Sequence, residues 1–308
     1  MAFTDFDVWV HDEHSSQVIQ QYDKGSAVDR AARKVTMSSS VQDIPRSDGF
    51  DITAVAKGAA YGEDDGTGDV VTLRARKAGG IKKFAVEDLN DSKVDLLATK
   101  RHDAAVSMAK FFDNATVGTS AAENGTTVLY TSVYKAVKSN DAAVGYTADA
   151  NYMSGAVTYA NLNSVLSLVE NSDYNDDLIW ILSPIFKGLI RGLLDGENRP
   201  LLQNVLVDGF TQQTLLGYPV EWAKGARVSA VNTDKPTGNH LAVVASRPLL
   251  IEGVANLPGL TNGVPGYAFQ GPAQGDGFND DTAKMKAAMR RAFVVGNVNG
   301  VAVFEKTS

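Results

Sequence analysis

The stretch from residue 43 to residue 88 limits the folds open to this chain more than any other part of the sequence. Apolar and polar residues alternate from Ile52 to Lys57, a turn-rich segment follows at Gly62–Gly68, and a second alternating run covers Val70–Arg76. This pattern predicts a long hairpin with a flexible tip. Both of its faces are too polar for a core, and an isolated pair of strands is barely stable in water. The hairpin therefore needs a partner surface.

The composition is that of an ordinary folded protein. The 308 residues allow about two compact domains, and 44% of the residues are hydrophobic. Without cysteine the chain has no disulfide, thiolate zinc site or cysteine nucleophile. Neither a signal peptide nor a membrane-spanning run is evident, so we expect a soluble intracellular protein without a membrane partner. The net charge of -7 argues against a general nucleic-acid binder.

The first half of the chain predicts an arm and one long helix. Residues 1–42 hold few large apolar side chains, so we expect an extended arm that lies on another surface and contains one short helix near Ser26–Lys34. Residues 91–115 predict a helix of about 20 residues, capped by Asp91 or Ser92. Residues 118–157 are expected to be mostly loop, with a short strand at Thr127–Tyr130.

The second half predicts alternating helices and strands. In chain order, the expected elements are a helix capped by Thr158 with Leu162, Val165, Leu166 and Val169 on its buried stripe, a buried strand at Leu178–Leu182, a helix from Ser183 and Pro184 to Asp195 and Gly196, strands within 214–222 and 241–252, an irregular loop at 256–282, and a hairpin about Asn299 and Gly300.

Signatures of catalysis and metal binding are missing, so we predict no catalytic, cofactor-binding or metal site. The phosphate-binding glycine loop and the His-Glu-x-x-His zinc motif do not occur. His11, Asp12, Glu13 and His14 adjoin one another in the arm, where a solvated polar stretch is the favoured interpretation. His102 is expected on the polar side of the long helix, and His240 precedes a strand without a nucleophile paired to it in the sequence.

Two groups of acids keep a hydrolase open as an alternative. Asp173, Asp176 and Asp177 precede the Leu178 strand, and Asp195 and Glu197 follow the next helix. Acids from separate strand ends could face each other across a cleft, as glycoside hydrolysis requires. We favour turn residues that cap nearby amides; a carboxylate-dependent hydrolase would act through Asp176 or Asp195.

Charge is divided along the hairpin. Residues 71–110 contain nine Lys or Arg and five Asp or Glu. The basic side chains on and after the second strand are Arg74, Arg76, Lys77, Lys82 and Lys83, whereas the tip carries Glu63, Asp64 and Asp65. No aromatic residues interleave with the basic ones, so complementary protein surface is favoured over nucleic acid. Together with the arm, this predicts a subunit covered by copies of itself.

One ordered set of elements carries a family resemblance. A strand ends in a small residue and Pro, a helix follows and stops at Asp with Arg beyond it, and the next strand carries Leu-Gly-Tyr-Pro-Val. The order is similar to that in major capsid proteins of tailed bacteriophages of the HK97 type. The residues concerned are Trp180, Ser183, Pro184, Asp195, Arg199, Leu216, Gly217, Pro219 and Val220.

The resemblance implies an α+β, HK97-like capsid fold in four parts. These are an N-terminal arm (1–42), an extended β-hairpin loop (43–88), a peripheral domain with a long spine helix (89–155 and 283–308) and an axial domain (156–282). The isopeptide cross-link of some members is not carried over, because Lys57 and Lys77 lie on the hairpin but no matching Asn and Glu are identified.

The resemblance also implies a function. The chain would assemble in the host cytoplasm, as hexamers and pentamers, into the icosahedral phage head, and would enclose double-stranded DNA without sequence-specific contacts. Separate scaffolding, portal and decoration proteins are possible partners. An encapsulin-type bacterial compartment shell, which shares the fold, is the main alternative.

Overall fold

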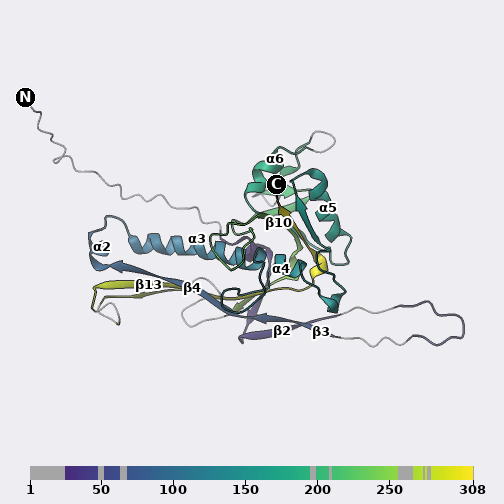
Figure 1. The fold of residues 1–308 in the computed structure, drawn as a ribbon, viewed down its shortest axis with the longest axis horizontal. Coiled ribbons are helices and arrows are strands. Elements are labelled where there is room, and N and C mark those ends of the chain that lie inside the picture. The colour runs from purple at the N-terminus through teal and green to yellow at the C-terminus, as the bar shows by residue number, and fades with distance from the viewer. Residues whose placement is uncertain are drawn as a thin grey trace, which may run out of the picture.

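Two β-sheets, a long helix and a projecting ribbon make up the computed structural model of this α+β chain (Figure 1). The structure describes residues 25–47, 52–62, 68–194, 199–207, 210–255, 266–272, 275 and 279–307. The first sheet has five strands, β1 (Arg33–Met37), β4 (Arg76–Ala85), β11 (Leu250–Ala255), β12 (Gly266–Gln270) and β13 (Thr282–Val295). The second has seven, in the order β5 (Tyr152–Gly155), β14 (Val301–Lys306), β10 (His240–Ser246), β6 (Leu178–Leu182), β9 (Tyr218–Trp222), β8 (Phe210–Leu215) and β7 (Leu202–Val207). The ribbon pairs β2 (Val41–Arg46) with β3 (Asp69–Arg74).

The helix α3 (Leu96–Val117) lies along β4 and β13 (Figure 1). It begins one turn later than predicted, because residues 86–91 form a separate helix, α2 (Val86–Asp91). The Ser92 hydroxyl accepts from the Val94 amide at 3.1 Å, and the carboxylate of Asp95 caps the helix by accepting from the Ala98 amide at 2.9 Å. Its last two turns are buried, so only this end is held by a continuous core.

The seven-stranded sheet separates two apolar clusters. Alternate residues of β6 face opposite clusters: Ile179 and Ile181 contact the cluster beneath α3 and the short helix α4 (Val133–Val137), while Trp180 and Leu182 face α5 (Tyr159–Glu170) and α6 (Ile185–Arg191). Burial on both faces explains the uninterrupted apolar run of this strand. The predictions of a buried strand here and of a helix capped by Thr158 are both confirmed.

The paired part of the ribbon lies elsewhere than predicted. Residues 52–56 form no strand, and the partner of β3 is β2, ten residues earlier. Ile44 of β2 packs against a small cluster formed by Met37, Leu73, Ile251 and Ala292, which gives this pairing a core. Residues 52–62 have no such cover, and alternation in sequence alone did not distinguish the two segments.

The predicted C-terminal hairpin is wrong. Asn299 and Gly300 belong to a 3-10 turn at Val298–Gly300, and the flanking strands β13 and β14 enter different sheets. The run at 241–252 divides in the same way, since a short 3-10 turn at Arg247–Leu249 sends β10 and β11 into separate sheets. Pro248 has no amide hydrogen and so favours a break at this point.

The sheets also cut across the predicted domain boundaries. Strand β14 lies in the sheet of β6, although residues 283–308 were predicted with the spine helix. Conversely, β11 and β12 lie beside β13, although residues 156–282 were predicted as one axial unit. Strand β12 also replaces part of the expected irregular loop, whose residues 256–265 lie outside the described part.

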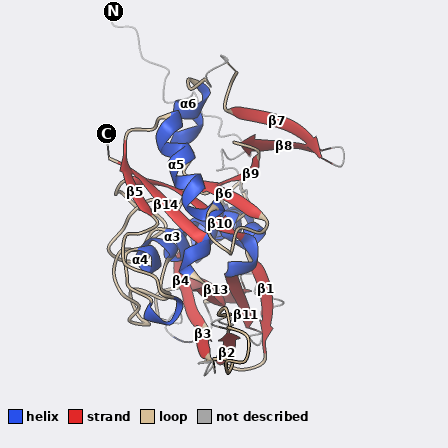
Figure 2. Cartoon of the chain, turned by 90° about the vertical axis from the view of Figure 1, so that its right-hand side faces the viewer, coloured by secondary structure: helices blue, strands red, loops and turns tan. Residues whose placement is uncertain are grey.

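The start of the described chain is more integrated than an arm. Helix α1 (Ala27–Ala31) buries Ala27, Val28 and Ala31 in the main core, and β1 pairs in parallel with β11. Residues 127–130 are largely buried but form no strand, and α4 follows them, together with a 3-10 turn at Ala142–Val144. Figure 2 shows the seven-stranded sheet above and the ribbon strands below.

Candidate assembly interface

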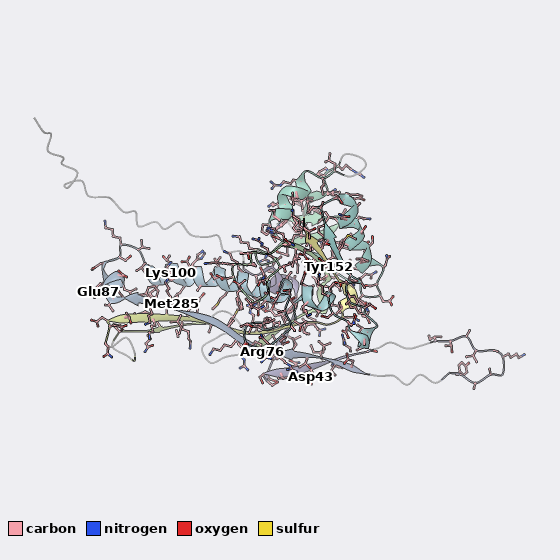
Figure 3. All side chains as sticks on the ribbon, in the orientation of Figure 1. Asp43, Arg76, Glu87, Lys100, Tyr152 and Met285 are labelled. Carbon is pink, nitrogen blue, oxygen red and sulfur yellow. The ribbon has the colours of Figure 1, made fainter. Side chains whose placement is uncertain are left out.

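Strands β2 and β3 form a narrow ribbon that leaves the body of the molecule (Figure 1). The register pairs Val41 with Arg74 and Arg46 with Asp69. Across the ribbon, the Thr72 hydroxyl donates to the carboxylate of Asp43 at 2.7 Å. Figure 3 places Asp43 on the ribbon and Arg76 where the chain returns to the body.

Arg46 fastens the ribbon to the body. Its guanidinium donates to the carboxylates of Asp69 on β3 and Asp141 in the body, the latter at 2.8 Å, and to the carbonyl oxygen of Gly296 at 3.2 Å. Burial lowers the pKa of Arg46, but hydrogen bonds to Asp141 and Asp69 outweigh it and leave that pKa raised. The hydrogen bond from Arg46 likewise lowers the pKa of Asp69. Arg46 and Asp69 are therefore both charged at neutral pH.

Beyond the paired strands, the described chain exposes large apolar side chains. Ile52 is 87% exposed and Tyr61 is 85% exposed. Burying an apolar side chain of this size gains about 1.5–3 kcal/mol, which the isolated subunit does not obtain here. The predicted acidic tip, Glu63, Asp64 and Asp65, lies outside the described residues.

A buried carboxyl on α3 holds the N-terminal end of the described chain. Asp113 accepts hydrogen bonds from the Ser26 hydroxyl at 2.5 Å and the Val28 amide at 3.2 Å. Burial raises the pKa of Asp113 to about 7, although both hydrogen bonds lower it. The same Ser26 hydroxyl caps α1 by accepting from the Asp29 amide.

A second buried acid supports the same segment. Glu252 on β11 is fully buried and accepts from Arg291 on β13 at 2.7 Å, and Arg291 also contacts Asp29 at 3.1 Å. Burial raises the pKa of Glu252 to about 7, while the charge of Arg291 opposes this rise. Two buried acids with raised pKa values therefore lie on either side of the point where the chain enters its core.

The opposite end of the molecule presents a second exposed apolar group. Leu206 on β7 is 76% exposed, and the members of this group are Ile185, Leu189, Leu194, Val205 and Leu206. They come from α6, the segment after it and β7, which is the edge strand of the seven-stranded sheet (Figure 2). Scattered apolar residues are normal on a surface, whereas a group on neighbouring elements is typical of a protein contact.

The residues that carry the family resemblance have structural roles. Trp180 is completely buried, and Leu216 and Gly217 form the tight turn between β8 and β9 with φ of 52° and 89°. Positive φ at both central residues is typical of a two-residue hairpin turn. Ser183 was predicted to cap α6, but its hydroxyl instead contacts Nδ1 of His240 at 2.7 Å. Asp195 lies outside the described residues.

Of the two groups of acids considered for hydrolysis, the structure describes only the first. Asp173, Asp176 and Asp177 are exposed, and Asp177 contacts Arg247 at 3.7 Å. The Asp195–Glu197 pair and the His11–His14 cluster lie outside the described residues. Within the described part, no three His, Asp or Glu side chains gather as a metal site, and no helix there is long and apolar enough to cross a membrane.

Several residues that organise these surfaces were not predicted from the sequence. Asp113 and Glu252 were missed although each interrupts an apolar segment, Phe111–Phe112 before Asp113 and Leu249–Ile251 before Glu252. A lone acid in such a run is a usable signal, because buried acids are rare without a partner. Arg46 offers no comparable signal, since its partner Asp141 is distant in sequence.

Comparisons with known proteins agree with this architecture. The model of the phage capsid family matches residues 7–243. A capsid structure from Mycobacterium phage Bobi is 16% identical, with a TM-score of 0.70, and covers 98% of this chain and 97% of that one. One from Microbacterium phage Oxtober96 is 16% identical, with a TM-score of 0.67 and 98% coverage of both chains.

A non-phage particle has the same fold. The capsid of an empty gene transfer agent particle is 14% identical, with a TM-score of 0.63, and covers 98% of this chain and 97% of that one. No protein with a curated function matches the sequence. The match to the family model covers most of the chain, and the fold is that of HK97-like capsids. This chain therefore belongs to the phage capsid family and is a structural protein of the capsid shell.

Proposed function

We propose that the chain forms hexamers and pentamers that close into an icosahedral head around double-stranded DNA, with assembly in the host cytoplasm. Assembly from copies of itself and a place in the virion capsid follow from the family. The observation that carries the finer proposal is the ribbon with its uncovered Ile52 and Tyr61. An adjacent subunit would bury these side chains and pair with the backbone of residues 52–62.

The proposed subunit divides its contacts between its two ends. The ribbon end would overlap a neighbour at the capsomer periphery, and the apolar group around α6 and β7 would face the capsomer axis. Each contact can be weak, because many contacts per subunit add up through multivalency. Separate scaffolding, portal and decoration proteins would act on the same subunit. DNA would be enclosed without base readout, in keeping with a net charge of -7.

Electron microscopy of the purified protein tests this proposal. We expect rings of five and six subunits and closed shells, and a protein that stays monomeric at high concentration would contradict it. Nuclease-protected DNA inside shells from infected cells would distinguish a phage head from an encapsulin-type compartment, which would hold protein cargo. We further propose that the chain has no enzymatic activity. The substitution Asp176→Asn should then leave assembly intact, and neither the variant nor the unchanged protein should show hydrolase turnover.

A further inference from the structure

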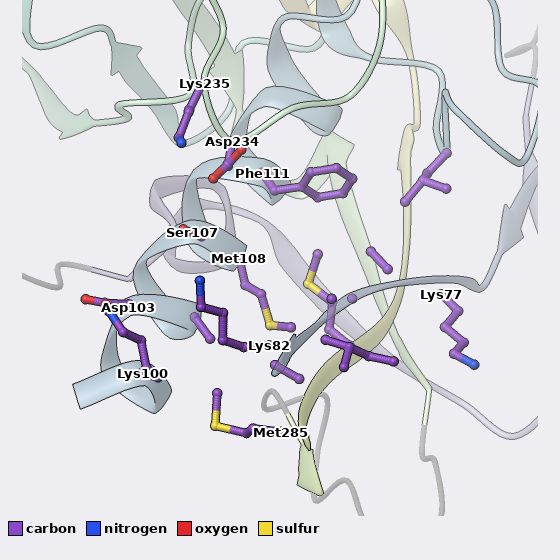
Figure 4. A pocket seen from close by; sticks show the side chains of 18 of the residues that line it. Lys77, Lys82, Lys100, Asp103, Ser107, Met108, Phe111, Asp234, Lys235 and Met285 are labelled. Atoms are coloured by element: carbon purple, nitrogen blue, oxygen red, sulfur yellow. Dashed lines mark hydrogen bonds and ion pairs between the residues drawn. The ribbon is translucent and has the colours of Figure 1, made fainter. Parts of the chain in front are cut away.

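A groove opens between α3 and strand β4 (Figure 4). It has a volume of about 810 Å³. Its apolar lining includes Met108 and Phe111 from α3 and Met285 and Met289 from β13. Methionine is a flexible, polarisable side chain that adapts to aromatic partners. The groove is thus suited to an apolar segment that contains aromatic residues.

The groove and the adjoining face of β4 are basic. Lys77, Lys82, Lys100 and Lys235 line the groove, and the two acids in its lining are Asp103 and Asp234. Lys100 is paired with Asp103 at 2.7 Å. Among the described residues, neither Lys77 nor Lys83, which lies on the same face of β4, forms an ion pair. This edge can therefore accept an acidic segment.

Strand β4 is an edge strand. One edge pairs with β13 along its whole length, from Ala85 with Thr282 to Arg76 with Arg291. No other strand in the described part of the chain pairs with its outer edge. At Gly80 a Cβ atom would meet nothing within 4 Å, so the groove is open beside this edge. Exposed edges invite pairing with other chains, and proteins commonly cover them.

The sequence before the described part has the matching chemistry. From Thr4 to Val10 it reads Thr-Asp-Phe-Asp-Val-Trp-Val, in which Phe6, Val8 and Val10 alternate with Asp5, Asp7 and Trp9. Such alternation predicts a strand with one apolar and one mainly acidic face. The first 23 residues contain no Lys or Arg. Charge and periodicity thus both fit the groove and its edge.

The point where the described chain begins is close enough for this contact. Ser26 is held by Asp113, and the 13 residues of helix from Asp113 back to Lys100 span about 20 Å. Residues 14–24 can extend over roughly 36 Å, at about 3.3 Å per residue. A tether of this length also gives an effective concentration in the millimolar range for the groove of the same subunit.

We propose that in the unassembled subunit residues 3–13 pair with the free edge of the subunit's own β4. Phe6, Val8 and Val10 enter the groove, and Asp5 and Asp7 lie beside Lys77 and Lys83. The added strand covers an edge that otherwise pairs with other chains. This role lies beyond the construction of the shell, and its test does not require shells to form.

Carbodiimide cross-linking of the full-length protein, followed by mass spectrometry, tests the contact directly. An equal mixture of ordinary and 15N-labelled protein is treated at a concentration where light scattering shows monomers. We expect links from Asp5 or Asp7 to Lys77 or Lys83 within one isotope form. The Lys34–Asp29 pair, 2.9 Å apart, serves as the internal control. The proposal is overturned if the control link forms without the others or if the links join the two isotope forms. It is also overturned if Lys77 and Lys83 are linked to Glu63–Asp65 instead.

A substitution in the groove provides a second test. Gly80→Glu places bulk and negative charge where the segment enters, whereas Gly188→Glu makes the same change at another open glycine, on α6. We expect chymotryptic cleavage after Phe6 and Trp9 to become at least 10-fold faster in Gly80→Glu alone, with circular dichroism unchanged. Equal cleavage rates would overturn the proposal. If Gly80→Glu does not fold, the cleavage rate of the double variant Lys77→Glu and Lys83→Glu is measured instead, with the same expected increase and the same contrary outcome.

Discussion

The centre of the seven-stranded sheet and the ribbon are built on opposite principles. In the sheet, β6, β10 and β14 are buried on both faces, and Trp180 is inaccessible to solvent. On the ribbon side, Ile52 is 87% exposed, and beyond the paired strands the described chain has no regular structure. The first region is stabilised by its own chain, whereas the second leaves apolar side chains exposed among the described residues, which a neighbouring copy would bury in the proposed assembly. Stability and assembly should therefore be separable by mutation.

The largest expected effect on stability is at Trp180. Trp180→Ala removes a completely buried indole from the apolar cluster under α5 and α6 and leaves a cavity, so the free energy of unfolding should fall by about 3–5 kcal/mol. Leu206→Ala, at a side chain that is 76% exposed, should change it by less than about 0.5 kcal/mol. Urea unfolding measures both. Similar losses of unfolding free energy in the two variants would contradict the difference between a buried and an exposed side chain.

The same contrast explains how much of the fold could be predicted. Buried elements with a strong period, such as β6 and the Leu162–Val169 stripe of α5, were predicted correctly because their pattern reflects one local environment. The ribbon and the Asn299–Gly300 turn were misassigned because strand pairing is decided by distant partners. Ile44 packs against a cluster that includes Ile251, and β14 pairs with β10. Neither partner can be identified from the local sequence.

The interface was only partly predictable. A hairpin that needs a partner and a divided charge pattern follow from residue types, as does the order of elements from Trp180 to Val220. The Arg46–Asp141 contact and the Ser26–Asp113 contact join residues roughly 90 positions apart, and their formation depends on the tertiary fold. The family resemblance argued from the sequence rests on the order of elements more than on any single motif.

Two buried parts of the molecule, the segment around Ser26 and strand β14, should respond oppositely to pH. The pKa values of Asp113 and Glu252 are about 7 in the folded state, against ordinary values of 3.8 and 4.5. The folded state therefore binds more protons, and stability should fall as pH rises from about 4 to about 7. Urea unfolding at pH 5 and pH 8 measures this change. Asp113→Asn should remove about half of it; an unchanged slope would show that Asp113 is not responsible.

Glu305 on β14 provides the opposite case. Burial raises its pKa, but hydrogen bonds from Tyr152, Asn239 and Tyr134 outweigh burial and leave the pKa lowered. Its contribution is present above the ordinary pKa and is lost as pH falls through the folded value. Hydrogen exchange should therefore show β14 opening at acidic pH, where the segment around Ser26 becomes more protected. Opening of both segments in the same pH range would contradict this division.

The attachment of the ribbon should matter less for global stability. Arg46→Ala removes contacts to Asp69, Asp141 and Gly296, and we expect a loss of about 1–2 kcal/mol, because Asp69 is partly screened by water. Amide exchange in β2 and β3 should accelerate more than exchange in β6. Arg74→Ala, on the exposed face of the same ribbon, is the matched control. Equal acceleration in the two variants would show that Arg46 does not fasten the ribbon.

The smallest expected effect on stability should accompany a large effect on assembly. Ile52→Asp places a charge at a side chain that is 87% exposed, so the free energy of unfolding should change by less than about 0.5 kcal/mol. In a shell the same position would be buried against a neighbour, and an unpaired carboxylate there is strongly unfavourable. Thr53→Asp adds the same charge at the next, also exposed, residue. Electron microscopy should show shells for Thr53→Asp and free subunits for Ile52→Asp. Normal shells from Ile52→Asp would mean that the exposed apolar residues of the ribbon are not what joins the subunits.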